Sequence, residues 1–318
     1  MTDVCRSQLI SRCADWMSQL PTQLLSVPLW DLAIPGSHDT MTYCLDQHSP
    51  VLSSEPWILT VLDHVVPCVM RPCIKKWATT QELTISSQLD SGIRFLDLRI
   101  AHKTEDPSQK FYFAHGLYSL ITVKEALTDV THWLERHTKE VVIVALSAFD
   151  DVNPEQHNNL IDFLMQLFSK KLCPKSETPS LGACWAHGYQ VILSYADPSG
   201  SGHEELWPAW DYWWANKSDP NLVISYLEQK KKTGRPDGFF MAGLNLTEDT
   251  RSQNWSIPYI KFLEASRPER QTRYFEVDLR LSPSSFDPSL LFLINRLFRD
   301  SQVVGCACAA PVYHALLH

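Results

Sequence analysis

The sequence lacks any apolar run long enough to cross a membrane. Runs such as residues 141–146 fall far short of the roughly 20 residues that a spanning helix needs. An excess of basic residues is also missing, since 28 Lys and Arg stand against 36 Asp and Glu, for a net charge of -8. This balance excludes a general affinity for the phosphates of a nucleic acid, although a local basic pocket for one phosphate is compatible with it. We expect no transmembrane segment and no nucleic-acid partner.

A secretory leader and a paired set of cysteines are missing as well. Residues 1–21 mix acidic and basic side chains into the segment and do not resemble a signal peptide. The nine cysteines are odd in number and scattered, which predicts reduced thiols instead of a disulfide framework. These features predict a cytoplasmic protein whose contact with membranes is at most peripheral.

The chain contains no glycine-rich dinucleotide turn, internal repeat or low-complexity tract. Strand-like apolar runs alternate with segments of helical spacing, which is typical of an α/β protein with a mostly parallel sheet. The expected strands cover residues 31–34, 93–100, 111–114, 140–147, 190–195, 238–243 and 273–279, and the expected helices cover residues 123–137, 154–170, 221–231 and 288–299. This pattern favours a closed barrel over a doubly wound sheet. The predicted fold is α/β, a single distorted (β/α) TIM-type barrel over residues 29–300, after a helical lead-in at 1–28 and before a tail at 301–318.

The expected strand at 93–100 places its charges on one side. Asp97 and Arg99 point to one face, whereas the residues that point to the other face are aliphatic: Leu96, Leu98 and Ile100. In a barrel, helices cover the apolar outer face, and polar side chains near the end of a strand line a site at the C-terminal rim. The alternation therefore predicts a site at the end of this strand.

Two histidines flank this strand along the chain, each just past an apolar run. His38 lies in the segment Pro-Gly-Ser-His-Asp-Thr that begins at Pro35, and His115 follows the run at 111–114. Two imidazoles and a guanidinium are what cleavage of a phosphodiester by an internal hydroxyl requires. One histidine removes a proton, the other delivers one, and an arginine holds the non-bridging oxygens. The sequence therefore predicts an enzyme.

Together these three motifs resemble the X region of phosphatidylinositol-specific phospholipase C. Residues 30–45, 206–214 and 242–247 resemble more narrowly the stand-alone X-domain-containing proteins of animals, which lack the lipid-binding and regulatory modules of the larger signalling enzymes. The likeness runs from about Trp16 to Thr247 and continues more weakly to Asn295. Each motif alone is common, but three of them in order at family-like spacing are specific.

The resemblance implies a role for each site residue. His38 would be the general base, His115 the general acid and Arg99 the group that binds the phosphate. Asp97 and Asp39 would hold and polarise these groups. The implied reaction is attack of the inositol 2-hydroxyl on phosphorus, which releases diacylglycerol and an inositol cyclic phosphate that water then opens.

Two positions depart from the family pattern. The strand that ends at Ser147 normally carries a charged residue there, and the serine keeps only a small polar group, which leaves rate and affinity open. The final strand normally brings an aspartate toward the base histidine. Asp278 is the candidate, although residues 274–277 differ from the usual small-residue context.

The resemblance also bears on metal use. Calcium-dependent members carry a second acid two residues after the first acid on this strand. In this chain Asp97 is followed by Arg99, as in the metal-independent bacterial branch. A guanidinium supplies positive charge at that position and repels calcium. We predict no metal ion and no other cofactor.

Each site residue also has a structural interpretation. His38 could cap its turn, and His115 could be a satisfied core histidine. Asp39 could form an Asx-type turn, and Asp278 could be ordinary polarity at the end of a strand. The acid and the arginine of the strand at 93–100 could form an ion pair, which is costly inside a barrel unless well hydrogen-bonded.

An aromatic cluster is the last feature of note. Its members are Trp207, Trp210, Tyr212, Trp213 and Trp214. Such side chains either enter a bilayer interface or pack beneath their own loop, and the sequence leaves both open.

Three functions follow from these observations. The leading hypothesis is a phosphodiesterase that acts on phosphatidylinositol-type lipids at a membrane surface. The alternatives are a phosphodiesterase for soluble glycerophosphodiesters and an inactive binder of inositol-lipid headgroups. Two intact histidines favour catalysis, because a binder needs no proton donor opposite a proton acceptor. The sequence does not indicate an oligomeric state.

Overall fold

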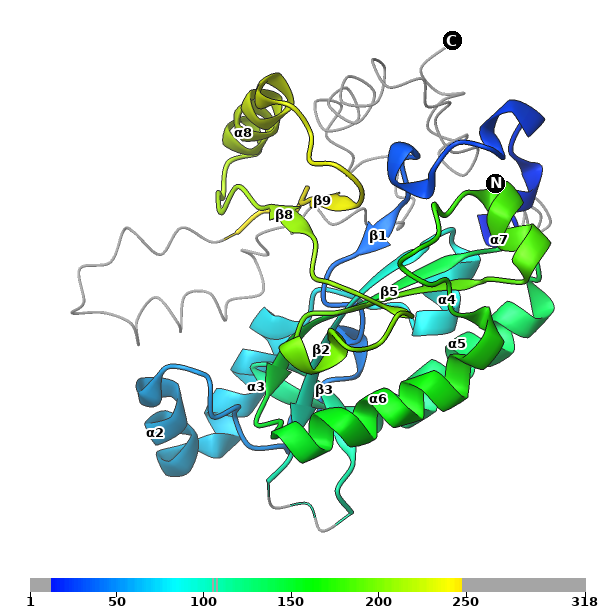
Figure 1. Cartoon of the computed structure of the whole chain (residues 1–318). Helices are drawn as coiled ribbons and strands as arrows, with labels where there is room; N and C mark the ends of the chain where they lie inside the picture. The colour runs from blue at the N-terminus through cyan, green and yellow to red at the C-terminus, as the bar shows by residue number, and fades with distance from the viewer. Residues whose placement is uncertain (1–12, 105, 107, 248–318) are drawn as a thin grey trace, which may run out of the picture. The chain divides into compact units, whose positions relative to one another are not determined.

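The computed structural model describes residues 13–104, 106 and 108–247 (Figure 1). These residues belong to two compact units, one within residues 13–209 and the other within 210–247. The site residues predicted from the sequence belong to the first unit, except Asp278, which lies outside the described residues.

A seven-stranded sheet forms the centre of the first unit. The strands are β1 (Gly36–Ser37), β2 (Phe95–His102), β3 (Phe111–His115), β4 (Leu117–Thr122), β5 (Val142–Asp150), β6 (Val191–Tyr195) and β7 (Leu206–Trp207). They follow the order β4-β3-β2-β5-β6-β7, and β1 pairs with β2 off this path. All pairs are parallel except β2 with β3 and β3 with β4.

The pairing register brings the motifs together. β1 runs parallel to β2 with Ser37 opposite Leu96, so His38 arrives beside Asp97. β3 runs antiparallel to β2 with Phe113 opposite Ile100, so its end, which carries His115, returns toward the same stretch of β2. Residues that are far apart in the sequence thus meet at one place on the sheet.

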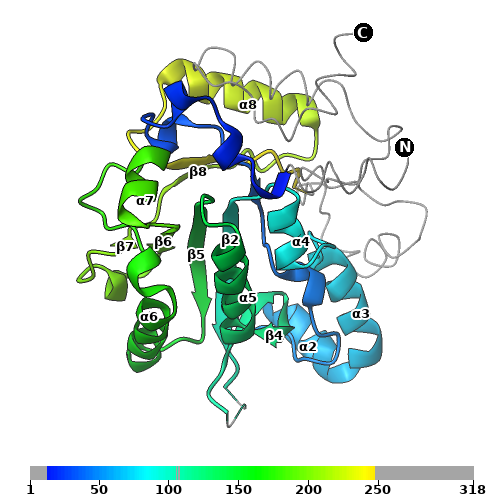
Figure 2. The same cartoon turned by 90° about the vertical axis from the view of Figure 1, so that its right-hand side faces the viewer.

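Six described α-helices accompany this sheet. They are α2 (Trp57–Val65), α3 (Pro67–Ala78), α4 (Ile85–Asp90), α5 (Val123–Arg136), α6 (Pro154–Phe168) and α7 (Leu181–His187). Short 3-10 helices cover Met17–Gln19, Thr22–Leu24, Leu29–Asp31, Thr42–Cys44, Ser169–Lys171 and Pro198–Gly200. Helices α5 and α6 lie on the same face of the sheet (Figure 2).

Local chemistry explains the two long helices. Each begins with a capping box, from Thr122 and Glu125 in α5 and from Asn153 and Gln156 in α6, which satisfies the first free backbone N–H groups. The apolar residues of each helix recur at helical spacing and are buried, so each helix covers the sheet with one face. The helices expected at 123–137 and 154–170 are therefore present.

A buried ion pair joins the N-terminal segment to the sheet. The Arg94 guanidinium bonds the Glu140 carboxylate at 2.7 Å, and both side chains are fully buried. Arg94 also donates to the backbone carbonyls of Cys13 and Ala14, while Glu140 accepts from the N–H of Met17. These bonds satisfy the polar atoms that folding removes from water.

The second unit is small. It contains β8 (Asp211–Trp213), α8 (Pro220–Thr233) and β9 (Phe240–Ala242), and β8 pairs in parallel with β9. Its core holds Trp213 together with Val223 and Leu227 of α8. Of the aromatic cluster, Trp213 is thus a packing residue, whereas Tyr212 and Trp214 remain exposed.

Some sequence expectations need correction. The strand expected at 31–34 is wrong, because the chain forms a 3-10 helix over Leu29–Asp31 and pairs with β2 only after Pro35, which has no N–H to donate. The strand expected at 273–279 and the helix expected at 288–299 lie outside the described residues. Among the described helices, none combines the length and the apolar character that crossing a membrane requires.

Candidate active site

A tight turn after β1 presents His38 and Asp39. Gly36 lies against Phe95, where an added Cβ would come within 3.0 Å of the ring, so only glycine fits without a shift. Asp39 adopts a φ of 47°, in the left-handed region that aspartate tolerates better than most residues. Thr40 ties the turn to β2, because its N–H donates to the Asp97 carbonyl at 2.9 Å.

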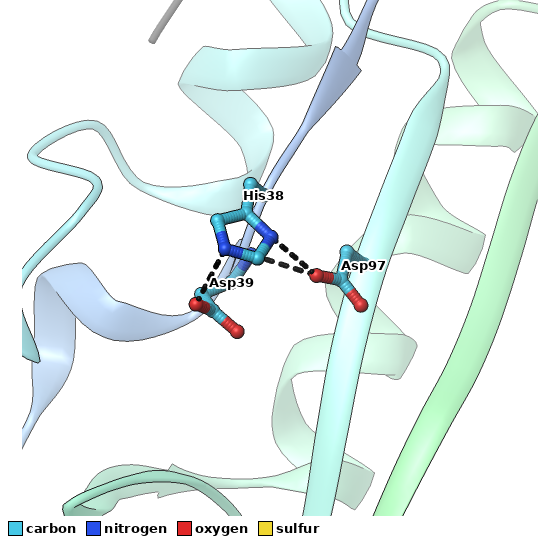
Figure 3. A group of neighbouring side chains, drawn as sticks. All are labelled: His38, Asp39 and Asp97. Carbon is cyan, nitrogen blue, oxygen red and sulfur yellow. Dashed lines mark hydrogen bonds and ion pairs between the residues drawn. The ribbon is translucent and has the colours of Figure 1, made fainter. Parts of the chain in front are cut away.

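Asp97 on β2 receives three hydrogen bonds. One carboxylate oxygen accepts from His38 Nδ1 at 2.9 Å and from the Asp39 N–H at 3.1 Å (Figure 3). The other oxygen accepts from Ser147 Oγ at 2.6 Å. Burial alone would raise the pKa of Asp97, but the hydrogen bond and charge of His38, the charge of Arg99 and the hydroxyl of Ser147 lower this pKa to about 2. Asp97 is therefore an anion that orients its neighbours.

Ser147 reaches Asp97 through an irregularity of the sheet. β2 and β5 pair in register up to Leu98 and Leu146, and then the register shifts, so that Arg99 lies opposite Ala148. Ser147 is the extra residue of this bulge, a feature that re-aims side chains. Where the resemblance implies a charged residue, this chain has a hydroxyl that donates to Asp97.

His38 is held between two carboxylates. Its Nδ1 donates to Asp97, and its Nε2 lies 3.2 Å from Asp39 Oδ2 (Figure 3). Burial works to lower the pKa of His38, but the hydrogen bond to Asp97 and the negative charges of Asp39 and Asp97 outweigh burial and the charge of Arg99, so this pKa is raised. The histidine thus holds a proton more readily than an exposed one.

His115 has its tautomer set by the backbone. Its Nδ1 lies 2.8 Å from the Ala78 carbonyl oxygen, which only accepts, so Nδ1 carries a hydrogen and donates it. The Trp77 ring stacks on the imidazole with centroids 5.7 Å apart. Nε2 is left facing the site, 3.6 Å from Asp39 Oδ2.

The carboxylate of Asp39 lies at the centre of the site, where Arg99 and both histidines approach it. Its side chain is only 1% exposed, yet neither oxygen has a hydrogen-bond partner in the described structure. Oδ1 forms an ion pair with Arg99 Nε at 2.6 Å, and Oδ2 is the atom that the Nε2 atoms of both histidines approach. A guanidinium has five N–H donors, so Arg99 can bind a second anion in addition to Asp39.

A pocket adjoins these groups. Its lining residues are Asp39, Met41, Thr42, Leu45, Asp97, Arg99, Phe113 and Ala114. The charged members come from the turn after β1 and from β2, and neither His38 nor His115 is among the lining residues. Two imidazoles, a guanidinium and an oriented carboxylate next to a pocket are suited to proton transfer on a phosphate ester.

Comparisons with known proteins identify the family. The family model described as PI-PLC X 1 matches residues 74–219. PI-PLC X domain-containing protein 1 of Danio rerio is 66% identical over 237 residues, which cover 74% of this chain and 77% of the relative. The human protein of the same name is 46% identical over 236 residues, which cover 74% of this chain and 73% of the relative.

The chain belongs to the family of PI-PLC X domain-containing proteins. Solved structures agree on the fold of this X-domain protein. The phosphatidylinositol-specific phospholipase C of Listeria monocytogenes is similar with a TM-score of 0.50 and 19% identity, over 75% of this chain and 81% of that chain. A mutant of the Staphylococcus aureus enzyme is similar with a TM-score of 0.51 and 16% identity, over 75% and 80%.

This likeness confirms the fold class. The bacterial phospholipases have a TIM-type barrel, as the sequence predicts for this X-domain protein. The pairing among the described strands leaves the sheet open, with β4 and β7 at its two ends. β2, the strand of Asp97 and Arg99, lies in the interior of this sheet.

A divalent cation does not fit the carboxylates of this X-domain site. His38, Asp39 and Asp97 offer ligand atoms that lie within 4.8 Å of one another. Asp97, however, already accepts three hydrogen bonds, and Arg99 stands 2.6 Å from Asp39. A guanidinium at that distance repels a cation and already neutralises the carboxylate that would bind one.

The sequence prediction missed the last residue of α3 and the segment just after it, which together hold both histidines. The His38 carbonyl accepts hydrogen bonds from Thr80 Oγ1 at 3.1 Å and from Gln81 Nε2 at 3.0 Å. Ala78 fixes His115 from the same segment. Backbone carbonyls and the neighbours of a helix end leave no motif, so no sequence signal marks these residues.

Proposed function

We propose that this X-domain protein cleaves phosphatidylinositol to diacylglycerol and an inositol cyclic phosphate without a metal ion. The observation that carries the proposal is the meeting of the Nε2 atoms of His38 and His115 at one oxygen of Asp39, next to Arg99. A proton acceptor, a proton donor and a phosphate-binding group then surround one small volume. Membership of the family and the fold support the same reaction class.

His38 would act as the general base. In its neutral form, the proton on Nδ1 is held by Asp97, so the lone pair lies on Nε2, which faces the site. Nε2 takes the proton of the inositol 2-hydroxyl as that oxygen forms its bond to phosphorus. The nucleophile and the phosphate belong to one molecule, so little translational entropy is lost in this step.

His115 would act as the general acid. With Nδ1–H bonded to the Ala78 carbonyl, the second proton of the imidazolium sits on Nε2. That proton passes to the oxygen of diacylglycerol as its bond to phosphorus breaks. When water opens the cyclic phosphate, the roles reverse: His115 accepts a proton from water and His38 returns one to the inositol oxygen.

Arg99 would bind the two non-bridging oxygens of the phosphate. Its Nε is tied to Asp39, which fixes the plane of the guanidinium, and its side chain is about one-third exposed at 33%. A planar fork of donors matches two phosphoryl oxygens and stabilises the charge that builds up on them. Asp278 lies outside the described residues, and we propose that it orients His38 from the final strand.

The test compares two substrates under two conditions. The purified full chain is incubated with vesicles that contain phosphatidylinositol and with glycerophosphoinositol, each with and without a chelator, and the release of cyclic phosphate is followed. Turnover of the lipid that the chelator does not affect is the expected result. Loss of turnover with the chelator and recovery with calcium would overturn the metal-free mechanism.

The same assay separates the alternative functions. Vesicle binding without any turnover would indicate an inositol-headgroup binder. Turnover of glycerophosphoinositol alone would indicate a soluble glycerophosphodiesterase. That chemistry usually relies on carboxylates around a metal, and the ion pair between Arg99 and Asp39 opposes such a centre.

A further inference from the structure

We propose that the outer face of helices α2 and α3 docks on the anionic lipid surface that carries the substrate. This inference rests on the proposed function for its choice of partner. The face is defined by Trp57, Ile58, Val61, Val65, Val69 and Lys76. Figure 1 shows the two helices side by side.

The first observation is the concentration of exposed apolar side chains. Eleven large hydrophobic residues are exposed in the described part of the chain, and seven of them lie between Trp57 and Leu83. Trp57 is 74% exposed and Val65 is 70% exposed. Large contiguous apolar surface on a folded protein marks a place where it meets a partner or a membrane.

The second observation is that α2 buries its acidic residue and exposes its aliphatic residues. Its acidic residue, Asp63, is only 4% exposed and forms an ion pair with Arg71 of α3 at 2.6 Å. Ile58, Val61 and Val65 point outward instead. A helix on a water-facing surface places its charge outside and its aliphatic residues inside, so this arrangement is suited to an apolar environment.

The third observation is charge. Residues 57–83, the range of the exposed apolar cluster, contain three basic side chains, Arg71, Lys75 and Lys76, against two acidic side chains, Asp63 and Glu82. Because Arg71 pairs with Asp63, Lys75 and Lys76 supply the positive charge of the face. The whole chain carries a net charge of -8, so this segment is a positive region of an acidic protein. Phosphatidylinositol is an anion, and a membrane surface that contains it attracts basic residues placed next to an apolar face. A neutral apolar partner would gain nothing from these charges.

The fourth observation is continuity with the site. Trp77 of α3 is itself exposed and stacks on His115, and the next residue, Ala78, accepts the hydrogen bond from that imidazole. A membrane that covers α2 and α3 would therefore bring lipid headgroups close to the general acid. The substrate would not have to leave the bilayer entirely to reach it.

The experiment measures partition of the full chain onto vesicles of phosphatidylcholine, with and without phosphatidylinositol. The W57S/V65S variant is compared with wild type, and L120S/L222S serves as the matched control because both leucines are exposed elsewhere. We expect W57S/V65S to bind at least about tenfold more weakly, since two apolar side chains no longer enter the interface, and the control to bind normally. K76E should weaken binding most on vesicles that contain phosphatidylinositol.

Several outcomes would overturn the proposal. Equal binding by W57S/V65S and wild type would refute it, as would the absence of binding by wild type, which is expected if residues of this chain cover the face. A wild-type dimer that W57S/V65S converts to monomer, with vesicle binding unchanged, would assign the face to a second copy. Thermal unfolding of each variant checks that the fold is intact.

Docking and catalysis can fail separately. If wild type binds vesicles through this face but releases no cyclic phosphate, the docking surface stands and the proposed function falls. If W57S/V65S loses turnover of vesicles in step with binding but retains turnover of glycerophosphoinositol, both stand. Turnover of vesicles by W57S/V65S at the wild-type rate would overturn the docking surface alone.

Discussion

Among the individual residues, Asp97 has the most contacts that set the chemistry of the site. Its carboxylate accepts hydrogen bonds from His38, from the backbone N–H of Asp39 and from Ser147. The resulting pKa of about 2 keeps Asp97 charged at physiological pH. The negative charge orients the His38 ring and raises the pKa of His38. Asp97, together with the charge of Asp39, therefore sets the pH at which the base becomes available.

Replacing Asp97 by Asn should move the pH profile. The base works only when His38 is neutral, so kcat/KM of the wild type falls as the pH drops through the His38 pKa, which lies above the ordinary value of 6.5. Without the charge of Asp97 this pKa falls, so the acid limb should shift to lower pH, while kcat/KM at its maximum drops by about 100-fold. The profile is measured on vesicles that contain phosphatidylinositol. An acid limb that stays in place would assign it to another group.

Sequence reasoning succeeded at this scale where a side chain's direction follows from strand alternation. Asp97 and Arg99 do face the site together, while Leu96, Leu98 and Ile100 are buried in the core. Sequence reasoning could not predict that Arg99 pairs with Asp39 instead of Asp97, because this ion pair depends on the left-handed turn at Asp39. Pairing between residues 60 positions apart is a property of the folded chain.

At the level of elements, the end of α3 connects two motifs that the sequence separates. Ala78 bonds His115, while Thr80 and Gln81 bond the His38 carbonyl. Thr42 accepts from the backbone N–H groups of Thr80 and Gln81, so the segment is fixed on both sides. The distance between base and acid thus depends on one short segment.

The Thr80→Val change tests this connection. Valine keeps the shape of threonine but removes the hydroxyl that donates to His38, so we expect kcat to fall by roughly tenfold as the base loses its alignment, with KM almost unchanged. Thr80→Ser retains the hydroxyl and should behave like wild type. Steady-state kinetics on glycerophosphoinositol and on vesicles provide the measurement. Equal rates for the two variants would show that the contact does not position His38.

Helices α2 and α3 show where sequence patterns fail. Neither was predicted, because α2 is only nine residues long and mostly apolar, and α3 contains Pro67 and Pro72 within its span. The segment of α2 is short and mostly apolar, and such a run does not distinguish a helix from a strand, while proline argues against a helix wherever it is not at the first turn. By contrast, α5 and α6 have capping boxes and inward apolar faces, so their prediction succeeded.

At the level of the whole molecule, the pair of Arg94 and Glu140 joins the N-terminal segment to the sheet. The guanidinium lies 4.7 Å from the Trp133 ring centroid and 5.9 Å from that of Trp16. Arg94 directly precedes Phe95, the first residue of β2, so this network supports the start of the strand that carries Asp97. It contributes to the stability of the fold and touches no reacting group.

Breaking this pair should be costly. Arg94→Met leaves the Glu140 carboxylate buried without its partner, and we expect the free energy of unfolding to fall by about 3–5 kcal/mol. The double change R94M/E140Q removes both charges and keeps an acceptor for the Met17 N–H, so it should be more stable than R94M. Urea denaturation followed by circular dichroism measures both. Equal stability of the single and double variants would contradict the importance of the unpaired charge.

The opposite roles of the two histidines are tested most directly by changing the leaving group. Phosphatidylinositol has a basic leaving oxygen that needs a proton, whereas a nitrophenyl ester of inositol phosphate has one that leaves without it. On the lipid, His38→Ala and His115→Ala should each lower kcat by about 10²- to 10⁴-fold. On the nitrophenyl ester, His115→Ala should recover most of its rate and His38→Ala should not. Equal recovery of both variants, or recovery of His38→Ala alone, would contradict the assignment of base and acid.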